Sequence, residues 1–157
     1  MAQEGDDKLE RLLKISAAGN IIDVVHADDY DLWEEVVRTV NQPLLGDSLE
    51  VFRERLYSAK NILYLADNTG ETVFDRVFLE ALHLPITYVV KGGPILNDAT
   101  LVEAIDAGID KLVPVIETGS RGPGTILEDS TPEFREIFAK ADLVLAKGQA
   151  NLETLDD

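Results

Sequence analysis

The chain contains no cysteine, which excludes disulfide bonds, thiolate zinc sites and a catalytic thiol. Aromatic residues make up only 6% of its 157 residues, and 14 Lys and Arg residues stand against 30 Asp and Glu residues. The formal net charge of −16 leaves no basic face of the kind that nucleic-acid binding needs. No apolar run is long enough to cross a membrane, and the polar, acidic N-terminus is unlike a signal or transit peptide. We therefore expect a cytoplasmic protein with no nucleic-acid or membrane partner.

What the chain does have is enough apolar material for a core, because 45% of its residues are hydrophobic. Its length is that of a single domain. Two interpretations of the acidic excess remain open. It solvates the surface, or its carboxylates converge at one point and bind a divalent cation.

Residues 1–60 carry helical patterns, and we expect them to form a helical lead-in. In residues 61–157 short apolar runs alternate with helical patterns, which is typical of a parallel sheet with helices on both faces. We therefore predict one α/β domain, a three-layer Rossmann-like fold with a mostly parallel sheet. The predicted strands are 61–66, 86–90, 112–116 and 142–146. The predicted helices are 8–18, 28–40, 47–59, 71–82, 98–107 and 131–140, with a last helical turn from Gln149.

In such sheets ligands bind beyond the carboxyl ends of the strands. Asp67 and Asn68 follow the first predicted strand and offer two oxygen ligands for a hard cation. The alternative is a simple turn, since Asp, Asn and Gly are common turn residues. Glu71 and Asp75 share one face of the next helix, where the helix dipole alone would explain two acids.

The loop after the second strand, residues 91–98, contains Lys91, two glycines and Asp98. The glycines free backbone amides for an anion. Asp98 either caps the following helix or faces a metal ion beside Asp67.

The third and fourth loops have the composition of phosphate-binding loops. Residues 118–125 combine hydroxyls, three glycines and one arginine, without the lysine-serine ending of a P-loop. A flexible surface loop is the alternative. Lys147 ends the fourth strand just before a glycine and a helix start, a place for a fixed charge near phosphate. Most lysine side chains are simply solvated, and only the position of Lys147 favours a role in phosphate binding.

Several catalytic signatures are absent from the sequence. It has no Ser-His-Asp or Cys-His set, no dinucleotide-binding glycine motif and no Walker loop. His26 and His83 lie away from the four loops, and we expect His83 to be structural.

Taken in order, these loops resemble the damage-control phosphatases, a metal-dependent family. The resemblance rests on residues 67–71 with 74–75, 91–94 with 97–99, and 147–149 with Asn151 and Glu153. Residues 17–23 are similar to the archaeal-type branch of the family. The likeness extends from about residue 15 to residue 155.

The resemblance implies hydrolysis of phosphate monoesters of small metabolites, such as sugar phosphates or phosphopantetheine-like esters. It implies a divalent cation, Mn, Co, Ni or Mg, held by Asp67, Asn68 and Asp98. Glu71 would contact the substrate or a water on the metal. Lys147 would bind the phosphate, helped by amides at Gly119 and Ser120. Whether Asp67 attacks the phosphoryl group or only binds the metal stays open.

Compared with that family, the chain lacks a longer helical region before residue 20 and a further strand and helix after residue 153. We therefore expect a truncated or abbreviated member, whose strand 142–146 lies at an open sheet edge and favours a homo-oligomer. One alternative is a non-catalytic domain that binds divalent cations or phosphorylated metabolites, its activity lost by truncation. Another is a sugar-nucleotide transferase, which would form product only with an acceptor alcohol.

Overall fold

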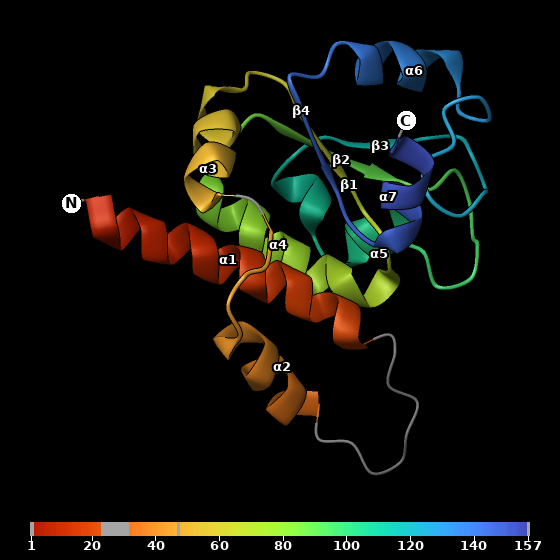
Figure 1. Ribbon diagram of the computed structural model, residues 1–157. Coiled ribbons are helices and arrows are strands. Elements are labelled where there is room, and N and C mark those ends of the chain that lie inside the picture. Colours follow the sequence, from red (N-terminus) through yellow and green to blue (C-terminus); the bar gives the residue numbers. More distant parts are fainter. Residues whose placement is uncertain (1, 23–31, 47, 157) are drawn as a thin grey trace.

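The computed structural model describes residues 2–22, 32–46 and 48–156. Its centre is a four-stranded sheet in the order β3-β2-β1-β4, in which all neighbouring strands are parallel (Figure 1). The parallel α/β architecture predicted from the sequence is confirmed. The strands are β1 (Ile62–Leu65), β2 (Ile86–Val90), β3 (Val115–Glu117) and β4 (Leu143–Ala146).

In residues 2–22, 32–46 and 48–156, three helices precede the sheet and four follow or connect its strands. Among the described residues, no helix is both long and apolar enough to cross a membrane. The start of the predicted helix 28–40 lies outside the described residues. The helices are α1 (Ala2–Ile22), α2 (Leu32–Asn41), α3 (Leu49–Ser58), α4 (Thr72–Leu82), α5 (Leu101–Asp106), α6 (Pro132–Ala139) and α7 (Gln149–Leu155), with short 3-10 turns η1 (Thr69–Glu71) and η2 (Ile109–Lys111).

Strand β1 is buried on both faces of the sheet, which explains its continuous apolar run. On one face Tyr64 and Tyr88 belong to a core shared with α1, α3, α4 and α5. On the other face Leu63 and Leu65 pack with Phe134 of α6. Figure 1 shows α1 and α4 side by side on one side of the sheet and α6 on the other. The result is the predicted three-layer arrangement.

Two predicted elements begin later than the sequence suggested. Thr100, not Asp98, caps α5, because its side chain accepts from the amide of Val102 while Glu103 completes a capping box. Strand β3 begins at Val115 rather than residue 112, because the chain first closes the turn η2.

The order of the strands reverses at β1. Strands β1, β2 and β3 follow one another in one direction, but β4 lies on the opposite side of β1. The connections change face as well, since α4 and α5 pack on one face and α6 on the other. Such a reversal opens a crevice at the carboxyl ends of the two strands that meet there. The ends of β1 and β4 are therefore the place to look for a site.

Candidate active site

The loops that follow β1 and β2 lie against each other at this edge of the sheet. Asn68 and Asp98 form an isolated antiparallel bridge, and the amide of Ala99 donates to the carbonyl of Asp67 at 2.7 Å. This pairing explains why Asp98 does not cap a helix. It brings together the backbones of Asp67, Asn68 and Asp98, the three residues expected to bind a metal.

The loop after β4 reaches the same point. Gly148 has φ of 79°, a left-handed conformation that favours glycine. A Cβ atom added to Gly148 would fall 1.9 Å from Oδ2 of Asp67. The carboxylate of Asp67 therefore lies in the crevice between β1 and β4, against bare backbone.

Asn68 connects this carboxylate to a second one. Its Nδ2 donates to Oδ2 of Asp67 at 3.2 Å and to Oε1 of Glu71 at 3.1 Å. The Glu71 side chain is 0% exposed and is paired through Oε2 with the ammonium of Lys147. A continuous polar chain thus runs from Asp67 to Lys147.

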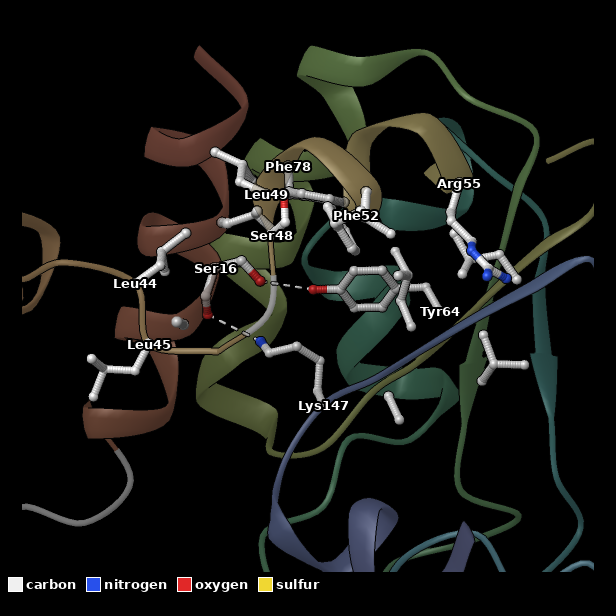
Figure 2. A pocket seen from close by; sticks show the side chains of 17 residues that line it. Ser16, Leu44, Leu45, Ser48, Leu49, Phe52, Arg55, Tyr64, Phe78 and Lys147 are labelled. Atoms are coloured by element: carbon white, nitrogen blue, oxygen red, sulfur yellow. Dashed lines mark hydrogen bonds between the residues drawn. The ribbon is translucent and has the colours of Figure 1, made fainter. Parts of the chain in front are cut away.

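Lys147 points inward from the end of β4 toward α1 (Figure 2). Its Nζ donates to Oδ1 of Asp75 and to the carbonyl oxygen of Ser16, both at 3.0 Å, besides its ion pair with Glu71. The alternative of a merely solvated lysine is therefore wrong. The structure holds this ammonium among two carboxylates and a carbonyl.

Asp75 is the site residue that sequence reasoning undervalued. Helix electrostatics alone do not account for it, because its side chain is 0% exposed. It accepts hydrogen bonds from the hydroxyls of Tyr64 at 2.5 Å, Tyr88 at 2.8 Å and Ser16 at 3.1 Å. A signal was present in the sequence, since Asp75 precedes the buried Phe78 by three residues and so shares its face of α4.

The buried groups shift one another's pKa values. Burial raises the pKa of Glu71, and the charge of Lys147 offsets only part of this effect. Burial by itself lowers the pKa of Lys147, but Asp75 and Glu71 raise it above its ordinary value. Burial and then the charge of Asp75 raise the pKa values of Tyr64 and Tyr88 well above that of free tyrosine. Lys147 is thus cationic at neutral pH, and both tyrosines keep their protons.

A second buried lysine lies at the end of β2. Lys91 is 3% exposed, and its Nζ lies 3.5 Å from Oδ2 of Asp98 and donates to the carbonyl oxygen of Gly124. Burial lowers the pKa of Lys91 and raises that of Asp98. Lys91 therefore links the loop of Asp98 to the loop that follows β3.

The loop after β3 packs closely against the end of β2. A Cβ atom added to Gly92 would fall 2.5 Å from Gly119, and the amide of Gly92 donates to the carbonyl of Ser120 at 3.0 Å. The Ser120 amide donates to Oγ1 of Thr118 within its own loop, at 3.2 Å. A phosphate contact from Gly119 or Ser120 stays a prediction.

The oxygen atoms around Asp67 suit a hard cation. Burial is the largest cause of the raised pKa of Glu71, and the nearby charges of Asp75 and then Asp67 add to it. Among the described residues, no group of three or more His, Cys, Asp or Glu side chains is placed to hold a metal. The predicted set has only two carboxylates, from Asp67 and Asp98, with the amide of Asn68 as third ligand. Such oxygen-only donors fit Mg or Mn, which retain several waters.

A cavity of about 700 Å³ lies beside Lys147, between α1, α3 and β4 (Figure 2). Ser16 and Lys147 are polar groups of its wall, and most of the remaining wall is apolar. The apolar residues include Leu13, Leu44, Leu45, Leu49, Phe52, Phe78, Leu143 and Leu145.

A parallel sheet with a strand-order reversal, and polar loops gathered at that reversal, define a doubly wound α/β protein. The chain matches the damage-control phosphatase ARMT1-like domain over residues 1–157. It therefore belongs to the damage-control phosphatase family, as the resemblance of its loops indicated.

Individual relatives support this membership. The chain is 42% identical over 154 residues to damage-control phosphatase PH1575 of Pyrococcus horikoshii, covering 94% of this chain and 53% of that protein. It is 42% identical over 161 residues to the uncharacterized protein MJ0202 of Methanocaldococcus jannaschii, covering 97% and 53%. The crystal structure of PH1575, a DUF89 family protein, superposes with a TM-score of 0.85 at 40% identity, covering 95% of this chain and 54% of that one. The chain thus spans about half the length of these relatives.

Proposed function

We propose that this chain carries the site of a metal-dependent phosphatase that hydrolyses phosphate monoesters of small metabolites. One observation carries the proposal. A chain of hydrogen bonds and an ion pair connects Asp67 through Asn68 and Glu71 to Lys147. It lies where the strand order reverses, so oxygen atoms that suit a metal ion lie close to the ammonium of Lys147. Family membership supports the phosphatase chemistry in general.

In this proposal Asp67, Asn68 and Asp98 hold a divalent cation, Mn, Co, Ni or Mg. When bound, the cation supplies Lewis-acid polarisation of the phosphoryl group. We assign Asp67 to the ligand set rather than to covalent attack, because the pairing of the two loops places Asp67 beside the other proposed ligands, Asn68 and Asp98. The cation would also reduce the repulsion between the carboxylates gathered at this edge.

The remaining residues act on the substrate. Lys147 carries a fixed positive charge that neutralises oxygens of the phosphoryl group as the ester bond breaks. Glu71, buried between Asn68 and Lys147, would contact the substrate or a water on the metal. Sugar phosphates and phosphopantetheine-like esters are the substrate classes that we propose to test first.

A phosphatase panel tests the proposal directly. Release of inorganic phosphate from these esters is measured with and without Mn, Co, Ni and Mg. We expect cation-dependent release that Asp98→Ala abolishes and that Asp106→Ala, an exposed acid on α5, leaves unchanged. Cation binding without any turnover would favour the non-catalytic binding domain instead, and release that needs an acceptor alcohol would favour a transferase.

A further inference from the structure

The ammonium of Lys147 uses all of its hydrogen-bonding capacity within the protein. An ammonium has three N–H donors. Here Nζ contacts Oδ1 of Asp75 and the carbonyl of Ser16 at 3.0 Å each, and Oε2 of Glu71. A phosphate oxygen can therefore reach this ammonium only if one of the three partners leaves.

Asp75 is the partner that is held most firmly. Hydroxyls from three different elements donate to its carboxylate: Ser16 from α1, Tyr64 from β1 and Tyr88 from β2. Both of its oxygens are used, because Tyr88 donates to Oδ2 and the other groups contact Oδ1. Moving Asp75 would leave several buried donors without an acceptor, which is costly.

The other two partners differ in how easily they can move. The carbonyl of Ser16 belongs to the backbone of the long helix α1 and moves only with that helix. Glu71 lies in the short turn η1, and its carboxylate is otherwise fixed by a hydrogen bond from Asn68 to Oε1. Moving the Glu71 carboxylate breaks only its contacts with Asn68 and Lys147 and does not require movement of α1.

We propose that Asp75 is the permanent partner of Lys147 and positions it, whereas Glu71 is an exchangeable partner whose place a bound phosphate group takes. This inference rests on the proposed phosphate site and deepens it. The cluster of Glu71, Asp75 and Lys147 carries two formal negative charges and one positive charge, so a phosphate is repelled while Glu71 stays in contact. Displacement of Glu71 removes that competition and frees a carboxylate beside Asn68, where the cation loop begins.

Binding of inorganic phosphate, measured by calorimetry with and without Mn, tests the exchange. Glu71→Gln keeps the size of the side chain and removes the competing charge, so we expect about tenfold tighter phosphate binding. The same substitution in a Lys147→Met background should give no tightening. Glu136→Gln, an exposed acid paired with Lys140 on α6, is the matched control and should have no effect.

The second carboxylate gives the sharper comparison. Asp75→Asn should weaken phosphate binding, because Lys147 loses its fixed position and only Glu71 remains as its anionic partner. Electrostatics alone would make both substitutions tighten phosphate binding, since each removes one negative charge. Tyr88→Phe removes one donor to Asp75 without changing the charge, and it should perturb folding less than Asp75→Asn does. We expect it to lower phosphate affinity by a smaller factor than Asp75→Asn.

Opposite effects of Glu71→Gln and Asp75→Asn, the first dependent on Lys147, support the inference. Equal tightening by both, or weaker binding in Glu71→Gln, overturns it. If the parent hydrolyses esters and Glu71→Gln binds phosphate no better, the exchange is wrong and the phosphatase function stands. If no ester is hydrolysed yet Glu71→Gln tightens phosphate binding, the exchange stands and the function is wrong. If neither the parent nor Glu71→Gln binds phosphate and no ester is hydrolysed, both the exchange and the phosphatase function are wrong.

Discussion

The carboxylate of Asp67 lies directly against the backbone of Gly148, across the gap between the ends of β1 and β4. A Cβ atom at Gly148 would fall 1.9 Å from Oδ2 of Asp67. Two residues 81 positions apart in the sequence thus share one small space. This contact joins the proposed cation loop to the loop of Lys147.

Gly148→Ala should displace Asp67 and abolish the stabilisation of the protein by Mn. Gly148 has φ of 79° and ψ of 161°, a backbone region nearly confined to glycine, so alanine there adds a cost of about 1–3 kcal/mol to the free energy of folding. Gly46→Ala is the control, because Gly46 also has a positive φ but no atom lies within 4 Å of the added Cβ. A Mn-dependent rise in melting temperature in Gly148→Ala equal to that of the parent would remove Asp67 from the cation site.

Cation binding should need Asp67 and Asp98 together, because each supplies one hard oxygen to the same ion. Asp67→Ala and Asp98→Ala should each abolish the rise in melting temperature that Mn produces. Asp106→Ala, on the exposed face of α5, should keep it. If both site variants still melt higher with Mn, the cation binds elsewhere.

Lys147 should matter to phosphate more than to the cation. Lys147→Met should leave the Mn-induced shift intact and weaken phosphate binding about 10- to 100-fold, through loss of a charge-assisted contact worth about 1.5–3 kcal/mol. Product inhibition by inorganic phosphate measures this effect. Lys140→Met, at the exposed C-cap of α6, is the matched control. Unchanged inhibition in Lys147→Met would place the phosphate away from β4.

The start of β4 provides a test of pH dependence. The carboxylate of Asp142 accepts from the amides of Lys60 and Asn61 at 2.9 Å each, and these hydrogen bonds lower its pKa. A pKa that is lower in the folded state stabilises the protein above the ordinary carboxyl pKa. The stabilisation is lost as the pH falls through the lowered value.

Asp142→Ala should therefore unfold more easily than the parent at neutral pH, and this difference should shrink as the pH falls below about 4. Denaturant melts at several pH values measure it. Asp110→Ala changes an exposed aspartate in η2 and serves as the control. A difference that grows toward acidic pH would mean that the amide contacts do not stabilise the fold.

The open edge of β4 leads us to expect self-association. Only one side of β4 pairs within the described chain, with β1. The amides of Leu143 and Lys147 face β1, and because amides alternate along a strand, that of Val144 faces the open edge. Unpaired strand edges recruit other chains, and salt should strengthen this association by screening the charge of −16.

Light scattering at low and high salt measures the assembly. Val144→Pro removes an outward-facing donor and should reduce the association without breaking the pairing with β1. Pro is placed at an edge for the same reason in natural sheets. A strictly monomeric parent at both salt concentrations would contradict the expectation.

The sequence by itself determined the local elements and the loops that matter. The continuous apolar run 62–65 forms a strand that is buried on both faces of the sheet. Turn residues after those runs predicted the loops of Asp67, Asp98 and Lys147. Because parallel strands end at one edge, the meeting of the first two loops followed from periodicity alone.

Only the tertiary structure decided which groups face one another at that edge. Strand order depends on how helices cover each face, so the contact between Asp67 and Gly148 has no signature in either loop. Asp98 had the pattern of a helix cap, but pairing with Asn68 moved the cap to Thr100. Local sequence patterns cannot predict such a contact, because it forms between residues that are distant in the sequence.

The burial of charge was decided at the same level. From the sequence alone, Asp75 is an acidic residue in a helix and Lys147 is a lysine at the end of a strand. Such residues are usually solvated. The fold brings Ser16 of α1, Tyr64 of β1 and Tyr88 of β2 to the same point, and their hydroxyls satisfy the carboxylate in the core. A buried carboxylate is stable only when its hydrogen bonds and counter-charge are supplied, and these come from segments that only folding brings together.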